Sequence, residues 1–264
     1  MTYASGRMIA KKDGAIGWMI FNQPEKRNAI SVDMWEAMPE ILGDFAQDDA
    51  IRVIVLAGAG EQAFISGADI SQFGEKRGTR DTVLAYNATA DRAAEALATV
   101  AKPTIAMIRG FCIGGGVGVA TSCDLRIAAD DARFGVPAAR LGLGYRYVGV
   151  KRLVDLVGPS FAKEIFFTGR QFTTAEALAM GLVNRGVPVA ELEAVARDTA
   201  NTIASNAPLT VSSIKLSVGE AMKPESERDL EIVQAAVDAC FASEDYVEGR
   251  TAFMEKRKPV FRGR

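Results

Sequence analysis

The stretch IAMIRGFCIGGGVGVATSCD, residues 105–124, places three consecutive glycines in the middle of an apolar run. Glycine weakens helices and strands alike, by roughly 0.5–1 kcal/mol relative to alanine in the interior of an element. A sequence that accepts Gly114, Gly115 and Gly116 in succession needs either a backbone turn that other residues cannot adopt or the close approach of another group to the bare peptide. This stretch alone leaves both explanations open.

The residues around the glycines predict a buried strand, a tight turn and a short helix of small residues. The first N–H groups of a helix have no intrahelical partner, so they attract an anion or a polarised oxygen. Two phosphate-binding motifs are excluded. The dinucleotide fingerprint fails at Val119 and Thr121, and the P-loop needs a lysine that is absent here. Close packing of helix on strand and a ligand site both account for the pattern.

The rest of the chain predicts strands joined by helices. A hairpin is expected over 7–22 with its turn at Asp13-Gly14, and an amphipathic helix follows Ser31 as N-cap. Further elements are expected as buried strands at 51–58 and 125–129 and as a helix at 83–100.

From about Pro159 the pattern becomes helical. Thr173 and Glu176 form a capping-box arrangement. Amphipathic stretches then run over 189–256, divided at Pro208 and Pro224. The pattern indicates an α/β protein with a helical C-terminal part.

Composition excludes several classes of function. The 264 residues carry a net charge of −2, which gives no basic surface for nucleic acid, and no apolar run is long enough to span a membrane. The N-terminal residues lack the apolar core of a signal peptide, so a cytoplasmic location is expected. The chain contains no histidine, which rules out Ser-His-Asp and Cys-His catalysis. Its three cysteines are widely spaced, so we expect no metal site and interpret Cys112 and Cys123 as buried packing.

Several ordered motifs together cover almost the whole chain. They are NQPEKRNAIS at 22–31, AFISGADI at 63–70, GFCIGGGVGVATSCDLRIAADDARFGVP at 110–137, FFTGRQFTTAEALAMGLVN at 166–184 and SEDYVEGRTAFMEKRKPVF at 243–261. This set resembles the crotonase (enoyl-CoA hydratase/isomerase) superfamily. The resemblance implies an α/β spiral of repeated ββα units over 1–200 and a helical trimerisation region over 201–264. It also implies a homotrimer or a dimer of trimers that acts on acyl-CoA thioesters, with coenzyme A as part of the substrate and no separate cofactor.

The resemblance also implies where the substrate binds. The backbone N–H groups of Ala68 and Gly115 would grip the thioester oxygen and stabilise enolate charge. Coenzyme A would lie along the backbone near Ala29 and the turn 68–70. Lys26 and Arg27 would reach its phosphates or remain solvated loop charges. The binding residues implied in this way are Lys26, Arg27, Ala29, Gly67, Asp69, Ile70, Gly114, Ala138, Lys258 and Phe261.

Two of these positions belong to the C-terminal region. Lys258 and Phe261 would reach the site of a neighbouring subunit. Asp69 and Asp124 are interpreted as structural carboxylates: Asp69 would fix its turn, and Asp124 would close a helix.

The sequence departs from the family at two positions. Hydratases carry glutamates where this chain has Gly118 and Ala138, so the groups that activate water are missing. Loss of CO₂ from a malonyl-type thioester needs no base, so a decarboxylase-like lyase is slightly preferred. The loop 141–150 resembles that of methylmalonyl-CoA decarboxylases, in which a tyrosine stands at Tyr145, although those enzymes keep an acid at the position of Gly118.

Alternatives remain at the site and for the whole chain. Tyr145 either handles a carboxylate or a proton, or only closes the acyl pocket. Arg140 and Arg146 are expected in surface ion pairs, and Glu75 is a remote candidate for an unusual base. The alternative functions are an atypical hydratase or isomerase, a non-catalytic acyl-CoA-binding protein and a thioester hydrolase.

Overall fold

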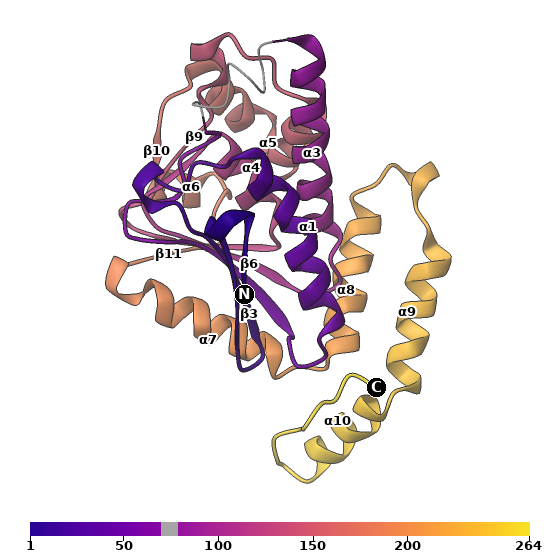
Figure 1. The fold of residues 1–264 in the computed structure, drawn as a ribbon. Helices are drawn as coiled ribbons and strands as arrows, with labels where there is room; N and C mark the ends of the chain where they lie inside the picture. The colour runs from indigo at the N-terminus through magenta and orange to yellow at the C-terminus, as the bar shows by residue number, and fades with distance from the viewer. Residues whose placement is uncertain (70–78) are drawn as a thin grey trace.

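The computed structural model describes residues 1–69 and 79–264. Its elements form two sheets surrounded by helices (Figure 1). The strands are β1 (Thr2–Tyr3), β2 (Met8–Asp13), β3 (Ile16–Phe21), β4 (Val53–Gly58), β5 (Ala63–Ile65), β6 (Thr104–Ile108), β7 (Phe111–Ile113), β8 (Leu125–Ala129), β9 (Arg133–Gly135), β10 (Phe172–Thr173) and β11 (Arg185–Val187). The helices are α1 (Val32–Gln47), α3 (Arg80–Thr99), α4 (Gly115–Ser122), α5 (Tyr147–Thr168), α6 (Thr174–Ala179), α7 (Leu192–Ala204), α8 (Pro208–Ala221), α9 (Leu230–Ala242) and α10 (Glu244–Met254).

The strands divide between the sheets in a repeating way. The larger sheet has the order β1-β2-β3-β4-β6-β8-β11, and the smaller has the order β10-β9-β7-β5. The first strand of each successive unit (β4, β6, β8) enters the larger sheet, the second (β5, β7, β9) enters the smaller one, and a helix follows. Neighbouring strands within these two sets are parallel. The expected α/β spiral of ββα units is confirmed.

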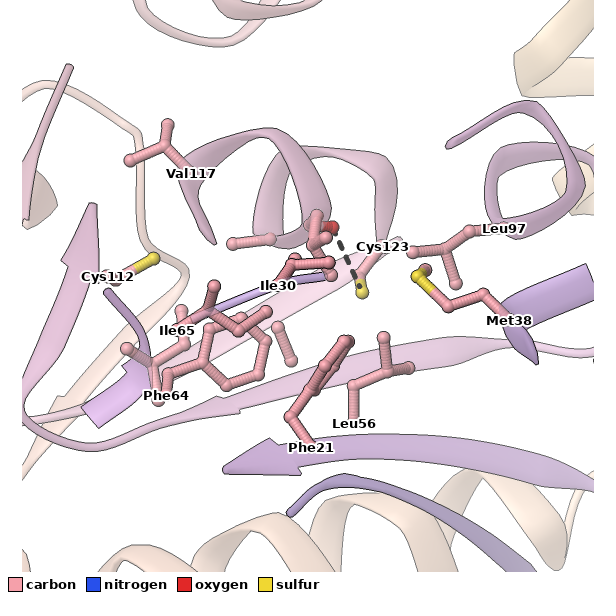
Figure 2. Close-up of a cluster of buried hydrophobic side chains, with 14 of the residues drawn as sticks. Phe21, Ile30, Met38, Leu56, Phe64, Ile65, Leu97, Cys112, Val117 and Cys123 are labelled. Carbon is pink, nitrogen blue, oxygen red and sulfur yellow. Dashed lines mark hydrogen bonds between the residues drawn. The ribbon is translucent and has the colours of Figure 1, made fainter. Parts of the chain in front are cut away.

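The larger sheet is buried on both faces. Ile54 and Leu56 of β4 belong to the cluster beneath α1, α3 and α4, whereas Val53 and Val55 face α7. Figure 2 shows part of the first cluster, where Phe21, Leu56 and Phe64 lie below α4. Burial on both faces explains the nearly continuous apolar run of the central strands.

The cysteines inside this cluster are packing residues, as expected. Cys112 and Cys123 are both buried (Figure 2). Burial raises the pKa of the Cys112 thiol strongly and that of Cys123 to about 12. Both side chains therefore stay protonated at neutral pH and are not nucleophiles.

Local expectations were confirmed with two corrections. The hairpin, the strands and the Thr173–Glu176 capping box are present. Ser31 precedes α1, but its hydroxyl donates to the Asp33 carboxylate and does not cap a backbone N–H. The second correction concerns 141–150, which was interpreted as a loop, because α5 already begins at Tyr147.

The C-terminal helices extend from the body of the protein. In Figure 1, α9 and α10 project away from the sheets, beyond α8. The division at residue 200 stays a prediction, and that residue lies within α7. In the described residues no helix is long and apolar enough to cross a membrane. The cytoplasmic location also stays a prediction.

Candidate active site

The two loops expected to grip a thioester lie against each other. A Cβ placed on Gly114 would be 4.0 Å from the Cα of Gly67, and one on Gly115 would be 3.9 Å from the carbonyl carbon of Gly67. That carbonyl carbon is bonded to the backbone nitrogen of Ala68. The fold therefore brings the start of α4 beside the Gly67–Ala68 peptide, although 47 residues (115 minus 68) separate Ala68 from Gly115.

The backbone of Ala68 is oriented by its neighbours. Ile30 N donates to Gly67 O at 2.8 Å, and Asp69 N donates to Ile30 O at 2.9 Å, which makes Ile30 and Ala68 a parallel bridge pair. In such a bridge the residue between the two hydrogen-bonded neighbours, here Ala68, points its own N–H and C=O away from the partner strand. The Ala68 N–H therefore points away from Ile30, and no described residue accepts a hydrogen bond from it.

Gly115 supplies the second donor. It is the first residue of α4, where a backbone N–H has no intrahelical acceptor. The preceding N–H, that of Gly114, donates to Gly135 O at 2.8 Å, whereas no described residue accepts from Gly115. Two unpaired N–H groups thus stand side by side at a helix start, an arrangement that can hold an oxyanion.

The three consecutive glycines serve three different purposes. Gly114 has a φ of +55°, which other residues rarely adopt. A Cβ on Gly116 would lie 2.4 Å from Ile65 O, so α4 packs on β5 with only a hydrogen between them. Figure 2 shows Ile65 in this layer, with Val117 of α4 nearby. A Cβ on Gly115 would meet nothing closer than Trp35 Cζ2 at 3.5 Å, so packing does not require glycine there.

Gly116→Ala should therefore damage the fold, while Gly115→Ala should not. Forcing a methyl group into the carbonyl of Ile65 should lower the free energy of unfolding by about 1–3 kcal/mol. Denaturant unfolding of both variants measures this difference. Equal stability of Gly116→Ala and the unchanged protein would contradict the packing assigned to Gly116.

The loop that carries Ala29 is fixed by a buried asparagine. Asn28 accepts a hydrogen bond from Gln23 N and donates to Ala59 O and Ala63 O. Arg27 and Asn28 both have positive φ angles, of 52° and 55°. Non-glycine residues in this conformation persist only where their surroundings hold them, and they gather at functional sites.

The expected phosphate-binding side chains lie on this loop. Lys26 Nζ is 2.8 Å from Asp69 Oδ2, and the Asp69 side chain is only 5% exposed. Asp69 therefore ties the loop to the turn that follows Ala68, as a structural carboxylate would. The Arg27 guanidinium lies 5.5 Å from the centre of the Phe111 ring. Contact of Lys26, Arg27 or Ala29 with coenzyme A stays a prediction.

The two positions where hydratases carry glutamate differ in the room around them. A Cβ on Gly118 would have no heavy atom of the described residues within 4 Å, whereas Ala138 is buried in the 3₁₀ turn Pro137–Leu141. Within the described ranges, no carboxylate hydrogen-bonds to either residue. Glu75 and Ile70 lie outside the described residues.

Tyr145 lies just before α5. Its ring packs on Phe166 with 4.7 Å between centroids, and 38% of the residue is exposed. Desolvation by the surrounding protein raises the pKa of Tyr145 above its usual value, against a smaller opposing effect of Arg152. The hydroxyl therefore stays protonated at neutral pH, where it can donate a proton but cannot act as a base.

The arginines of this region have different partners. Arg146 forms the expected ion pair, with Asp91, and also donates to Asn87 O. Arg152 was not predicted from the sequence, and its Nη1 donates to Ser122 Oγ at 2.8 Å. No element or motif was assigned to this position from the sequence, so no sequence signal distinguished it.

Trp35 was also missed as a site residue. Besides its contact with the Gly115 position, its Nε1 donates to Tyr86 Oη at 2.9 Å. Trp35 belongs to the apolar stripe of α1, so its spacing indicated only the core. The structure makes it a wall beside the Gly115 donor.

Lys258 and Phe261 are remote from this site within one chain. Phe261 lines a cavity bounded by α8, α9 and α10, and its carbonyl accepts from Arg52 Nη2 at 2.6 Å. Figure 1 places α10 and the C-terminus far from α4. Their contribution to a neighbouring subunit's site stays a prediction.

Comparisons with known proteins identify the family of this chain. Residues 11–264 match the family described as enoyl-CoA hydratase/isomerase. The chain is 36% identical to the short-chain-enoyl-CoA hydratase of Clostridium acetobutylicum, over 95% of each protein. It is 33% identical to the carnitinyl-CoA dehydratase of Proteus mirabilis, over 95% of this chain and 96% of that one.

A solved structure shows the same fold. The enoyl-CoA hydratase/carnithine racemase of Magnetospirillum magneticum superposes with a TM-score of 0.92 at 33% identity, over 99% of this chain and 97% of that one. With the sequence match and the architecture in agreement, the chain belongs to the enoyl-CoA hydratase/isomerase family.

Proposed function

We propose that this protein is a lyase acting on acyl-CoA thioesters through an enolate held by Ala68 and Gly115. The observation that carries the proposal is the pair of unpaired N–H groups at the start of α4 and in the Gly67–Ala68 turn. A thioester oxygen that accepts both hydrogen bonds gains stabilisation as it becomes an enolate oxygen. One such donor typically lowers the activation barrier by ~2.7–4 kcal/mol. Coenzyme A enters as part of the substrate, and the proposal includes no separate cofactor.

Decarboxylation is the reaction that these residues favour. The bond between the α-carbon and the carboxylate breaks, its electron pair enters the enolate, and CO₂ leaves. The α-carbon then takes a proton, which Tyr145 is protonated to supply. These reaction steps need no general base, in agreement with Gly118 and Ala138 at the two positions where hydratases carry glutamate.

Hydration or dehydration is the second candidate. It is favoured by relatives whose names include a short-chain-enoyl-CoA hydratase and a carnitinyl-CoA dehydratase. In that case another group must position water, because the usual carboxylates are missing.

We also propose a homotrimer or a dimer of trimers, built through the C-terminal helices. Large apolar side chains are exposed along α8, α9 and α10 and in the segment that follows, namely Ile214, Val218, Leu230, Phe241, Val247, Phe253 and Val260. A concentration of exposed apolar side chains in one region of a protein is typical of an interface. Lys258 and Phe261 would then stand near the coenzyme A of a neighbouring subunit.

Product analysis tests the reaction. Mass spectrometry should detect decarboxylated product from malonyl-CoA or methylmalonyl-CoA, and only slow hydration of crotonyl-CoA. Tyr145→Phe should lower decarboxylation by ~10²-fold while thioester affinity barely changes, because only the hydroxyl is lost. Unchanged decarboxylation in Tyr145→Phe would assign the tyrosine to the pocket wall. Rapid hydration of crotonyl-CoA by the unchanged protein would instead support the second candidate.

A further inference from the structure

Arg152 connects the N-terminal part of α5 to the far end of α4. Its Nη1 donates to Ser122 Oγ, and Ser122 Oγ donates in turn to Gly118 O, both at 2.8 Å. Gly118 lies one helical turn beyond the Gly115 donor. The guanidinium is therefore connected by two hydrogen bonds to the backbone carbonyl of Gly118.

Most of the hydrogen-bonding capacity of Arg152 is unused. A guanidinium carries several N–H donors in a planar fork. Among the described residues, the hydrogen bond to Ser122 is the one that Arg152 makes. No carboxylate of these residues lies within ion-pair distance of its guanidinium. Desolvation lowers the pKa of Arg152, with a smaller opposing effect of Glu95, yet an arginine remains charged at neutral pH.

A purely structural arginine in the same region is satisfied differently. Arg126, in β8, is only 3% exposed and donates to Leu182 O and Cys123 O at 2.8 Å and to Ala120 O at 3.4 Å. Its guanidinium thus holds three segments of backbone together. Arg152 donates to a single hydroxyl among the described residues, which offer no acceptor to its other N–H groups.

A second unpaired polar group lies close to Arg152. The Tyr145 hydroxyl has no hydrogen-bond partner within the described residues, and the positive charge of Arg152 acts on it. A Cβ at Gly118 would meet no described heavy atom within 4 Å. Beyond the two oxyanion donors, the described site therefore presents a hydroxyl and a cation with donors to spare.

We propose that Arg152 binds the end of the acyl group, and that the preferred substrates are acyl-CoA thioesters with a remote terminal carboxylate. The inference rests on the proposed function. Planar recognition of a carboxylate is what the arginine fork provides. From Gly115 to Ser122 the helix rises roughly 10 Å, so the carboxylate that reaches Arg152 stands several carbons beyond the thioester. It is not the group lost as CO₂, because binding that group to a cation would stabilise the ground state and slow its departure.

Calorimetry with three saturated thioesters of similar length tests the proposal without turnover. The ligands are glutaryl-CoA, pentanoyl-CoA and 4-(trimethylammonio)butanoyl-CoA, whose acyl ends are anionic, neutral and cationic. The unchanged protein should bind glutaryl-CoA at least about tenfold more tightly than pentanoyl-CoA, because a hydrogen bond to a charged group typically raises affinity by that factor. It should bind the cationic ligand most weakly. Arg152→Met should abolish this order, and Arg152→Lys should keep the preference for the anion.

Arg146→Met is the matched control, because that arginine is already paired with Asp91. It should leave the ratio of affinities unchanged. Equal binding of the three ligands by the unchanged protein would overturn the inference, even if Arg152→Met failed to fold. The inference would also be overturned if Arg152→Met still preferred glutaryl-CoA to pentanoyl-CoA. This includes the case in which the variant binds all three ligands more weakly but with the same ratio of affinities. Absence of binding by every thioester would overturn the proposed function, and the inference with it.

Discussion

Replacing Gly118 and Ala138 together with glutamate should raise the hydration of crotonyl-CoA by ~10³-fold or more. Each positioned acid–base group typically contributes 10²–10⁴-fold, and this chain lacks both. Each single variant should gain far less, because water needs one carboxylate to place it and another to exchange its proton. Loss of absorbance of the enoyl thioester measures the rate directly.

The described part of the structure permits the Gly118 side chain, since a Cβ there meets none of its heavy atoms within 4 Å. Ala138 is more demanding because it is 8% exposed, so thermal unfolding must accompany the kinetics. The double variant with glutamine at both positions is the matched control, equal in size but unable to ionise. A gain shared by the glutamine variant, or no gain in a folded glutamate variant, would contradict the assignment of these two positions.

Gly115→Pro should lower turnover of the best thioester substrate by 10²–10³-fold, the effect typical of losing one oxyanion donor. Proline has no N–H, and the first position of a helix is where it is best tolerated. Gly114, with φ 55° and ψ −109°, is outside the helical region that a following proline disfavours. The substitution therefore removes the donor at a position where the helix can still start.

Gly115→Ala is the control that keeps the donor. Its methyl group would make ordinary contacts, at 3.5 Å from Trp35 Cζ2 and 3.9 Å from the Gly67 carbonyl carbon. Steady-state kinetics of the two variants separate the N–H from the space around it. Equal losses in Gly115→Ala and Gly115→Pro would mean that bulk at this position, and not the hydrogen bond, governs the rate.

The framework of the fold could be predicted from the sequence because its signals are local. A buried strand such as β4 is a short apolar run, and the Thr173–Glu176 capping box depends on residues three apart. The glycine run showed that something unusual happens at 114–116, and the family motifs implied the oxyanion donors. Only coordinates could distinguish Gly116, which packs against Ile65 O, from Gly115, which packing leaves free.

The features that escaped the sequence depend on contacts between distant segments. Arg152 meets Ser122 across 30 positions of the chain, and Trp35 meets Tyr86 across 51. Local competition also misled the reading of Ser31, whose hydroxyl prefers the nearby Asp33 carboxylate to a backbone N–H. An ionised carboxylate is the stronger acceptor, and residue order alone does not show which group the hydroxyl will face.

Infrared difference spectroscopy of bound butyryl-CoA, labelled with ¹³C at the thioester carbonyl, tests the central claim most directly. The claim is that the N–H groups of Ala68 and Gly115 polarise this carbonyl, whichever reaction follows. The carbonyl band should move to lower wavenumber on binding to the unchanged protein and to Gly115→Ala, and much less on binding to Gly115→Pro. A bound thioester whose carbonyl band stays at its solution position in the unchanged protein would contradict the account.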